Sequence, residues 1–230
     1  MSDAPTLAAG LYLAPTSLGA LHAVTATHVG PAEHLIRALL QQPKALLTDD
    51  ADLCALAGVG DTDTALTVLA LAQDAGWIEG CTDEPQIPPG PLGRELPALL
   101  APLSDVGQAA LVDDQGFSLS SVGFTAETEA ELAVLAAEVV SLQRRRTTFA
   151  ASPTAASGWG LVDRHGATTI AIFPLAIGDQ PFVLILGGLP RLNHPSFVQL
   201  VTALSRRYAP TSDTQPDEPS APQQAGDPHA

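Results

Sequence analysis

The feature that most constrains the fold is a hairpin signature that occurs twice, fifty positions apart. Residues 111–116 are LVDDQG and residues 161–166 are LVDRHG, and alternating apolar residues precede and follow each copy. An Asp side chain accepts hydrogen bonds from turn backbone, and Gly supplies the positive φ that a bulged hairpin requires. Each copy therefore predicts two antiparallel strands joined by a tight turn.

The adjacent carboxylates of Asp113 and Asp114 allow a second interpretation, a catalytic or metal-binding pair. Acid–base chemistry requires both carboxylates to face one cavity, whereas successive strand residues point to opposite faces of a sheet. The second copy replaces Asp114 with Arg164 and retains the Asp and the Gly, which are the residues that a turn needs. The turn interpretation is therefore favoured over the catalytic one.

The spacing of apolar residues around the two hairpins predicts a domain with the order α-β-β-α-β-β-β-α. Its long helix begins after Thr125 with three glutamates, which suit the positive end of the helix dipole, and ends in three arginines. Asn193 is expected to cap the last helix. The expected helices are 92–103, 126–146 and 194–208, and the expected strands are 107–113, 116–124, 157–164, 167–174 and 181–188.

The first 82 residues show apolar side chains that recur at helical spacing. Helices are expected at 31–42, 50–59 and 61–77. The last of them has Asp61 as its cap and Gly76 as its stop, and a strand follows at Trp77-Ile78. This order is typical of a winged-helix-like module, although similar helix pairs also occur in proteins that do not bind DNA.

A proline-rich segment, DEPQIPPGPLG at 83–93, separates the two patterns. Proline removes backbone donors and disfavours helix, so we expect a semi-rigid linker at 83–92. The predicted organisation is an α+β protein with a helical module at 1–82, a second domain at 93–208 and an acidic tail at 209–230. The tail holds five prolines, four acids and no large apolar side chain, which predicts a solvated segment.

The distribution of charge makes nucleic acid an unexpected partner. The chain has 25 acidic residues against 10 Lys and Arg, a net charge of −15, and residues 1–92 have 11 acids against only two basic residues. A surface that binds phosphates needs clustered positive charge. The helix at 62–75, which would enter DNA in a helix-turn-helix, holds Asp63 and Asp74 and no Lys or Arg. A DNA-binding regulator is therefore a disfavoured alternative.

No pattern of reactive residues indicates an enzyme, a cofactor or a metal site. The sequence lacks a Gly-x-x-x-x-Gly-Lys-Ser/Thr phosphate loop, a Gly-x-Ser-x-Gly elbow and a Cys-x-x-Cys pair, and its six histidines are scattered. Asp49, Asp50 and Asp52 allow a cation site, but helix capping explains them better because no calcium-loop pattern follows. We also expect no membrane span and no signal peptide, hence a cytoplasmic protein.

Three features of residues 93–208 resemble the Roadblock/dynein light-chain domain. They are the Ala-Leu-Val-Asp-Asp-Gln-Gly opening of the first hairpin, the element order, and the glutamate-rich start of an Ala/Leu/Val helix. The resemblance implies a five-stranded antiparallel sheet with a long helix, and a bacterial, non-catalytic regulator that forms a homodimer and binds a small Ras-like GTPase. Because no arginine finger is recognisable, any acceleration of GTP hydrolysis would come from reshaping the GTPase's own residues.

The helix at 126–146 carries two apolar stripes that bear on the expected homodimer. The first consists of Leu132, Leu135, Val139 and Leu142, and the second of Ala133, Val134, Ala137 and Val140. A helix that lies on a sheet buries one stripe, so a second stripe indicates a second partner, unless the helix buries one broad face in a deep core. We therefore expect a dimer or partner interface at Val134, Ala137 and Val140.

Arg144, Arg145 and Arg146 form the densest basic cluster in this acidic chain. Positive charge complements the C-terminal end of the helix dipole, which is sufficient to explain the cluster. The alternative is a docking site for an acidic partner surface or a phosphate, so the three arginines belong to the predicted interface. Besides a GTPase regulator, the sequence leaves open an assembly or signalling scaffold without a GTPase partner.

Overall fold

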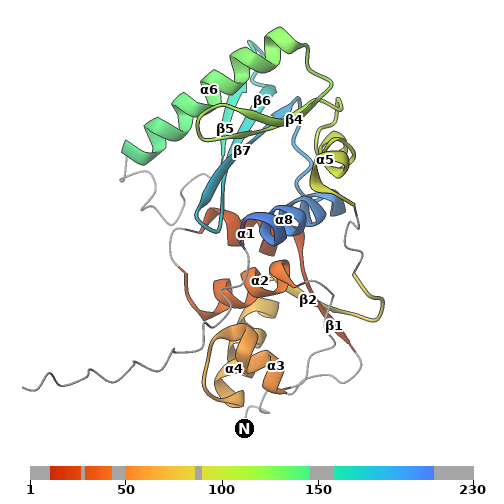
Figure 1. Ribbon diagram of the computed structural model, residues 1–230, viewed down its shortest axis with the longest axis vertical. Coiled ribbons are helices and arrows are strands. Elements are labelled where there is room, and N and C mark those ends of the chain that lie inside the picture. Colours follow the sequence, from red (N-terminus) through yellow and green to blue (C-terminus); the bar gives the residue numbers. More distant parts are fainter. Residues whose placement is uncertain (1–10, 27–28, 43–49, 86–89, 146–157, 210–230) are drawn as a thin grey trace, which may run out of the picture.

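The structure is a computed structural model that describes residues 11–26, 29–42, 50–85, 90–145 and 158–209 (Figure 1). It is an α+β protein, as predicted, and its described strands form antiparallel sheets of two and five strands. The N-terminal half contains β1 (Tyr12–Pro15), α1 (Ser17–Thr25), α2 (Pro31–Gln41), α3 (Asp50–Ala57), α4 (Thr62–Asp74) and β2 (Ile78–Cys81). The C-terminal half contains α5 (Leu92–Leu100), a 3-10 turn (Ala101–Leu103), β3 (Ala109–Asp113), β4 (Ser118–Val122), α6 (Ala126–Arg145), β5 (Trp159–Val162), β6 (Thr168–Ile177), β7 (Gln180–Gly187) and α8 (Pro195–Tyr208).

The five-stranded sheet has the order β4-β3-β7-β6-β5, so each predicted hairpin supplies one edge strand. β3 pairs with β4 and β5 pairs with β6, and both pairs contain a register shift. The shift lies between Leu111 and Val112 in the first hairpin and between Leu161 and Val162 in the second. The repeated sequence therefore forms the same bulged hairpin twice, on opposite sides of the sheet.

Both faces of this sheet are covered by helices (Figure 1). In β7, Val183 and Ile185 belong to a cluster with α6 on one face, while Phe182, Leu184 and Leu186 join a larger core on the other face. A strand that is buried on both faces has a continuous apolar run instead of an alternation. α6 packs on the first face, and α5 and α8 pack on the second.

The N-terminal helices pack directly against the C-terminal half. α1 contacts β6 and α8, and α2 contacts α8, so α8 lies between the sheet and the N-terminal helices (Figure 1). The buried side chains of both halves form one continuous cluster, which runs from Leu35 and Ile36 in α2 to Phe197 and Leu200 in α8. The proline-rich segment thus connects two parts that share a core.

β1 and α1 are elements that the sequence patterns did not predict. β1 pairs with β2, and α1 buries a narrow face made of small side chains, including Ala20, Ala23 and Val24. Such a face has a weak helical periodicity because alanine contributes little to it. β2 pairs with β1, which precedes the helices. The winged-helix-like character of this half stays a prediction.

α4 begins and ends at its predicted signals. The Asp61 carboxylate accepts a hydrogen bond from the Thr64 N–H at 2.9 Å, and Gly76 takes a φ of 71° after the helix. The glycine ends α4 at Asp74, three residues earlier than expected. No single helix in the described part of the chain has the length and apolar character of a membrane span. α3 and α4 have that length and apolar character only when taken together, and the two helices are bent by 71° relative to each other.

α8 begins one residue later than predicted. Its cap is His194 and not Asn193, and the His194 Nδ1 accepts a hydrogen bond from the Ser196 N–H at 3.2 Å. The reason is Pro195, because proline suits the first position of a helix and keeps the preceding residue extended. His194 has a φ of −74° and a ψ of 139°, as this restriction requires.

Candidate interaction surface

The two acidic turns have the same hydrogen bonds, which confirms their structural interpretation. The Asp113 Oδ1 accepts from the N–H groups of Gln115 and Phe117 at 2.9 and 2.8 Å. The Asp163 Oδ1 accepts from the corresponding N–H groups, those of His165 and Ala167, at 2.7 and 3.0 Å. In both turns the Asp Oδ1 is the acceptor, so the carboxylate that the two copies share stabilises the turn.

The glycines of these turns take the positive φ that the sequence predicts, 87° at Gly116 and 82° at Gly166. Gly116 has a second role, because its turn touches α6. A Cβ at this position would lie 3.1 Å from the Ala133 carbonyl oxygen. The first turn therefore lets the backbone of α6 come close to the sheet at Ala133.

Replacing Asp113 with Ala should lower the free energy of unfolding by about 0.5–1.5 kcal/mol, because the N–H groups of Gln115 and Phe117 in this exposed turn lose their acceptor. Asp113→Asn should retain most of the stability, because its amide oxygen can still accept. Urea denaturation monitored by circular dichroism measures both. Equal losses for the two variants would contradict the turn role and point to a need for the charge.

α6 faces the sheet with Leu132, Ala133, Ala136 and Val140, which are 8% exposed or less. This placement corrects the predicted interface at Val140, which is 6% exposed and packs in the cluster between α6 and the sheet. The physical reason is the close approach at Gly116, which favours the small side chain of Ala133 on the sheet side. Of the other two predicted residues, Val134 is 61% exposed and Ala137 is half-buried.

The larger side chains of the first predicted stripe lie on a flank of α6 that faces β5. Leu135, Val139 and Leu142 are all half-buried. One turn after Val139, the Gln143 Oε1 accepts a hydrogen bond from the Trp159 Nε1 in β5 at 3.2 Å. We call Leu135, Val139 and Leu142 the α6 flank. Leu132, the fourth member of the first predicted stripe, is buried in the cluster between α6 and the sheet, and Leu135 and Val139 pack against the same cluster.

β5 forms one edge of the sheet and, in the described part of the chain, pairs only with β6. Two of its side chains are exposed, Leu161 to 44% and Val162 to 62%. An edge strand is usually protected by charged residues, proline or a covering segment. The four residues of β5, WGLV, contain no charge and no proline.

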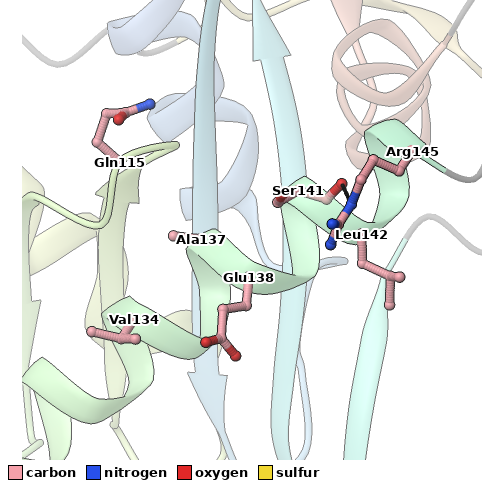
Figure 2. Close-up of a pocket in the computed structure, with 7 residues that line it drawn as sticks. All are labelled: Gln115, Val134, Ala137, Glu138, Ser141, Leu142 and Arg145. Carbon is pink, nitrogen blue, oxygen red and sulfur yellow. Dashed lines mark hydrogen bonds between the residues drawn. The ribbon is translucent and has the colours of Figure 1, made fainter.

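A shallow depression of about 610 Å³ lies open on the outer side of α6 (Figure 2). Figure 2 shows Gln115 on the first turn beside α6, and Leu142 pointing to the side away from Gln115. The depression is lined by Gln115, Val134, Ala137, Glu138, Ser141, Leu142 and Arg145. Three predicted interface residues, Val134, Ala137 and Arg145, therefore line this depression.

The predicted arginine cluster falls partly outside the described residues. Arg145 is exposed at the last turn of α6, and its Nε donates to the Ser141 carbonyl oxygen at 3.3 Å. Arg144 lies in the same turn of the helix, and Arg146 lies outside the described residues. The hydrogen bond to Ser141 agrees with the role of a cation at the negative end of a helix.

The other polar residues considered from the sequence are dispersed. Among the described residues, no group of three or more His, Cys, Asp or Glu is placed to hold a metal ion. Asp50 and Asp52 lie in the first turn of α3, where carboxylates suit the helix dipole, and Asp49 is outside the described residues. These positions agree with the capping interpretation.

His22, Glu33 and Trp77 form a cluster that the sequence patterns did not indicate. The His22 Nε2 lies 2.9 Å from the Glu33 Oε1, and the His22 ring stacks on Trp77 with centroids 3.9 Å apart. Burial raises the pKa of the Glu33 carboxyl, but hydrogen bonds from His22 and from the backbone of Glu33 and Gly30 outweigh it, so its pKa lies below the usual value. These contacts connect α1 to α2 through Glu33, and to Trp77, which follows α4.

This lowered pKa predicts a loss of stability in acid. A carboxyl whose pKa is lower in the folded state contributes stability above its unfolded pKa, and the contribution falls as pH drops below about 4.5. Glu33→Gln should cost about 1 kcal/mol of unfolding free energy at pH 7 and should flatten the dependence on pH between about 5 and 3. Urea denaturation at a series of pH values measures the slope; an unchanged slope in the variant would contradict the assignment to Glu33.

Comparison with known proteins gives one structural match. No family model and no curated protein matches the chain. The matching solved structure is the Roadblock/LC7 domain from Streptomyces avermitilis, which is 16% identical and has a TM-score of 0.34. The match covers 48% of this chain and 92% of that domain. Values this low transfer no function to this chain.

Proposed function

We propose that this protein is a non-catalytic regulator that forms a homodimer through the α6 flank and edge strand β5. The observation that supports the dimer is the position of two incompletely buried apolar surfaces side by side. Leu135, Val139 and Leu142 lie on the side of α6 that is tied to β5 by the Gln143–Trp159 hydrogen bond. Beside them, Leu161 and Val162 are exposed on an uncharged sheet edge.

A second copy of the chain satisfies both surfaces at once. An edge strand offers a row of backbone N–H and C=O groups, which an antiparallel copy of the same strand completes about a twofold axis. The same axis brings the flanks of the two α6 helices together in antiparallel orientation. The opposite edge strand, β4, is different in chemistry, because three of its five residues are serines and α5 contacts it.

Sedimentation equilibrium of the purified full-length chain tests this dimer. We expect a twofold increase in mass over a concentration range of about 0.1–100 µM, which covers the affinities of ordinary homodimers. A monomer throughout this range would refute the homodimer. Larger assemblies without a dimer would show that two β5 edges do not pair about a closed twofold axis.

We further propose that the dimer binds a small Ras-like GTPase of a bacterial cytoplasm. The support is the resemblance of residues 93–208 to Roadblock domains, together with an outer α6 surface that includes an open depression. The proposed role is activation or scaffolding. Any acceleration would act through the catalytic residues of the GTPase, because neither the exposed Arg145 nor any other arginine is identified as a finger.

The test uses any small GTPase that is encoded near the gene of this protein. Binding is measured by calorimetry with the GTPase loaded with GDP or a GTP analogue, and single-turnover GTP hydrolysis is measured with and without the protein. Binding that prefers one nucleotide state supports the proposal. Absence of binding to every small GTPase encoded nearby would refute it.

Two alternatives give different results in simple experiments. A scaffold without a GTPase partner would retain other proteins in pull-downs, and substitutions on the N-terminal half would remove them. A DNA-binding regulator would bind duplex DNA with an affinity that falls steeply with salt. The acidic α4, which carries Asp63 and Asp74 and no Lys or Arg, disfavours the second alternative.

A further inference from the structure

The chain makes a tight turn at the end of α4 that brings Trp77 back beside the helix. Gly76 takes a φ of 71°, and its N–H donates to the Gln73 carbonyl oxygen at 2.9 Å. The Trp77 N–H donates to the Ala72 carbonyl oxygen at 2.8 Å. This is the Schellman pattern, in which the residue after the glycine lies against the last turn of its helix. That turn begins at Leu71, so Leu71 and Trp77 belong to one surface.

The start of α1 packs against the same turn. The Thr16 Oγ1 donates to the Gly76 carbonyl oxygen at 2.7 Å, and the Thr16 N–H donates to the Trp77 carbonyl oxygen at 2.9 Å. A Cβ at Gly19 would overlap the Trp77 carbonyl oxygen, so the two backbones are in direct contact. The Leu18 Cδ2 lies beside Gly76, 4.0 Å from where a Cβ would be. These bonds hold the turn in place before any partner binds.

Three apolar side chains around this turn are incompletely buried. Leu18 is 55% exposed, Leu71 is 60% exposed and Trp77 is half-buried, and we call these three residues the Trp77 patch. His22, one turn after Leu18 on α1, stacks on the Trp77 ring with centroids 3.9 Å apart, which fixes the orientation of the indole. Single exposed leucines are ordinary, whereas two beside an immobilised tryptophan have the composition of an interface centre.

The surface around the Trp77 patch is acidic. Residues 45–93 hold nine acidic residues and no Lys or Arg. Asp74, in the last turn of α4, and Glu79, two positions after Trp77, are both exposed. Among the described residues of the N-terminal half, the one Lys or Arg is Arg37, and its Nε donates to a carbonyl oxygen of α1. This surface therefore repels a phosphate backbone or an anionic membrane and attracts Lys and Arg side chains.

We propose that the Trp77 patch docks a basic amphipathic segment of another protein. The apolar side chains of that segment contact Leu18, Leu71 and Trp77, and its Lys or Arg side chains face the surrounding carboxylates. An apolar centre with complementary charge around it is the arrangement of specific protein interfaces. The fixed turn lowers the entropy cost of binding. α6 lies at the opposite end of the molecule from α4, so this surface is separate from those of the proposed homodimer and GTPase complex (Figure 1).

Selection from a library of random peptides of about 16 residues, displayed against the full-length chain, tests the proposal. We expect enriched peptides to carry a net positive charge and apolar residues at helical spacing. The chain has two tryptophans, so in a Trp159→Phe background an enriched peptide should shift the emission of Trp77. No enrichment, enriched peptides without positive charge, or an unchanged Trp77 emission would overturn the proposal. Phosphatidylserine vesicles or duplex DNA that shift this emission would overturn it too, because the ligand would then be anionic.

Substitutions in the otherwise wild-type chain locate the binding surface, with the Kd of a labelled enriched peptide measured by fluorescence polarisation. Leu18→Gln and Leu71→Gln should each raise this Kd by about tenfold, and Asp74→Lys by about threefold or more, with a smaller effect in high salt. Glutamine and lysine suit exposed helix positions, and circular dichroism checks that each variant is folded. The matched controls on α6, Val134→Gln and Glu131→Lys, make the same changes at exposed positions and should alter the Kd by less than about twofold. Controls that weaken binding as much as the patch variants would show that the peptide binds elsewhere, and the proposal would be wrong.

Discussion

Removal of residues 1–82 is expected to leave a C-terminal half that does not fold cooperatively. α1 and α2 contribute six buried apolar side chains to the shared core, and both helices contact α8. They are Ala20, Ala23, Val24, Leu35, Ile36 and Leu40. Burial of one large aliphatic side chain contributes about 1.5–3 kcal/mol, and the surfaces that these helices cover would become exposed as well.

The loss is therefore comparable with the stability of a typical domain, which is about 5–15 kcal/mol. The measurement is thermal and urea unfolding of the full chain and of fragment 93–209, followed by circular dichroism and by binding of a hydrophobic dye. We expect a single cooperative transition for the full chain, and a fragment that binds the dye and has a broad transition.

Deletion of residues 210–230 is the control for this experiment, because that segment contributes no large apolar side chain. It should leave the transition of the remaining chain unchanged. A fragment 93–209 that unfolds cooperatively near the midpoint of the full chain would contradict the expectation. That outcome would instead support two independent domains joined by the proline-rich segment.

The C-terminal half was predictable from sequence because its signals are local. The spacing of Asp113 and Gly116 specifies a turn whose hydrogen bonds close within four residues, and the copy at Asp163 and Gly166 does the same. The long helix opens after Thr125, whose Oγ1 accepts from the Thr128 N–H at 3.2 Å. Such signals need no information about distant parts of the chain.

The remaining features depend on contacts between distant segments, which periodicity does not specify. Leu35 and Ile36 lie on the apolar side of α2, but this apolar pattern does not specify that α8 covers it. The orientation of α6 depends on Gly116, because the turn must approach the helix at Ala133 before the small residues face the sheet. The sequence placed Val140 in the predicted interface, whereas Val140 packs between α6 and the sheet.

Replacing Leu142 with Glu is expected to abolish the proposed dimer at micromolar concentration without unfolding the chain. Leu142 is half-buried on the α6 flank and lies outside the packed cluster between α6 and the sheet. In the proposed dimer it would lie in the contact between the two α6 flanks, so a carboxylate there would be desolvated without a partner. Because the twofold axis repeats the cost, the dimer Kd should rise by about 100-fold or more.

Val134→Glu is the matched control, because Val134 lies on the same helix but points outward and is 61% exposed. Its substitution should change the dimer Kd by less than about fivefold, since an exposed charge stays hydrated. Sedimentation equilibrium measures both variants, and circular dichroism checks that each remains folded. A larger effect at Val134 than at Leu142 would move the interface from the β5 side of α6 to its outer surface. The dimer would then use the depression beside Gln115, and that surface would be closed to any further partner.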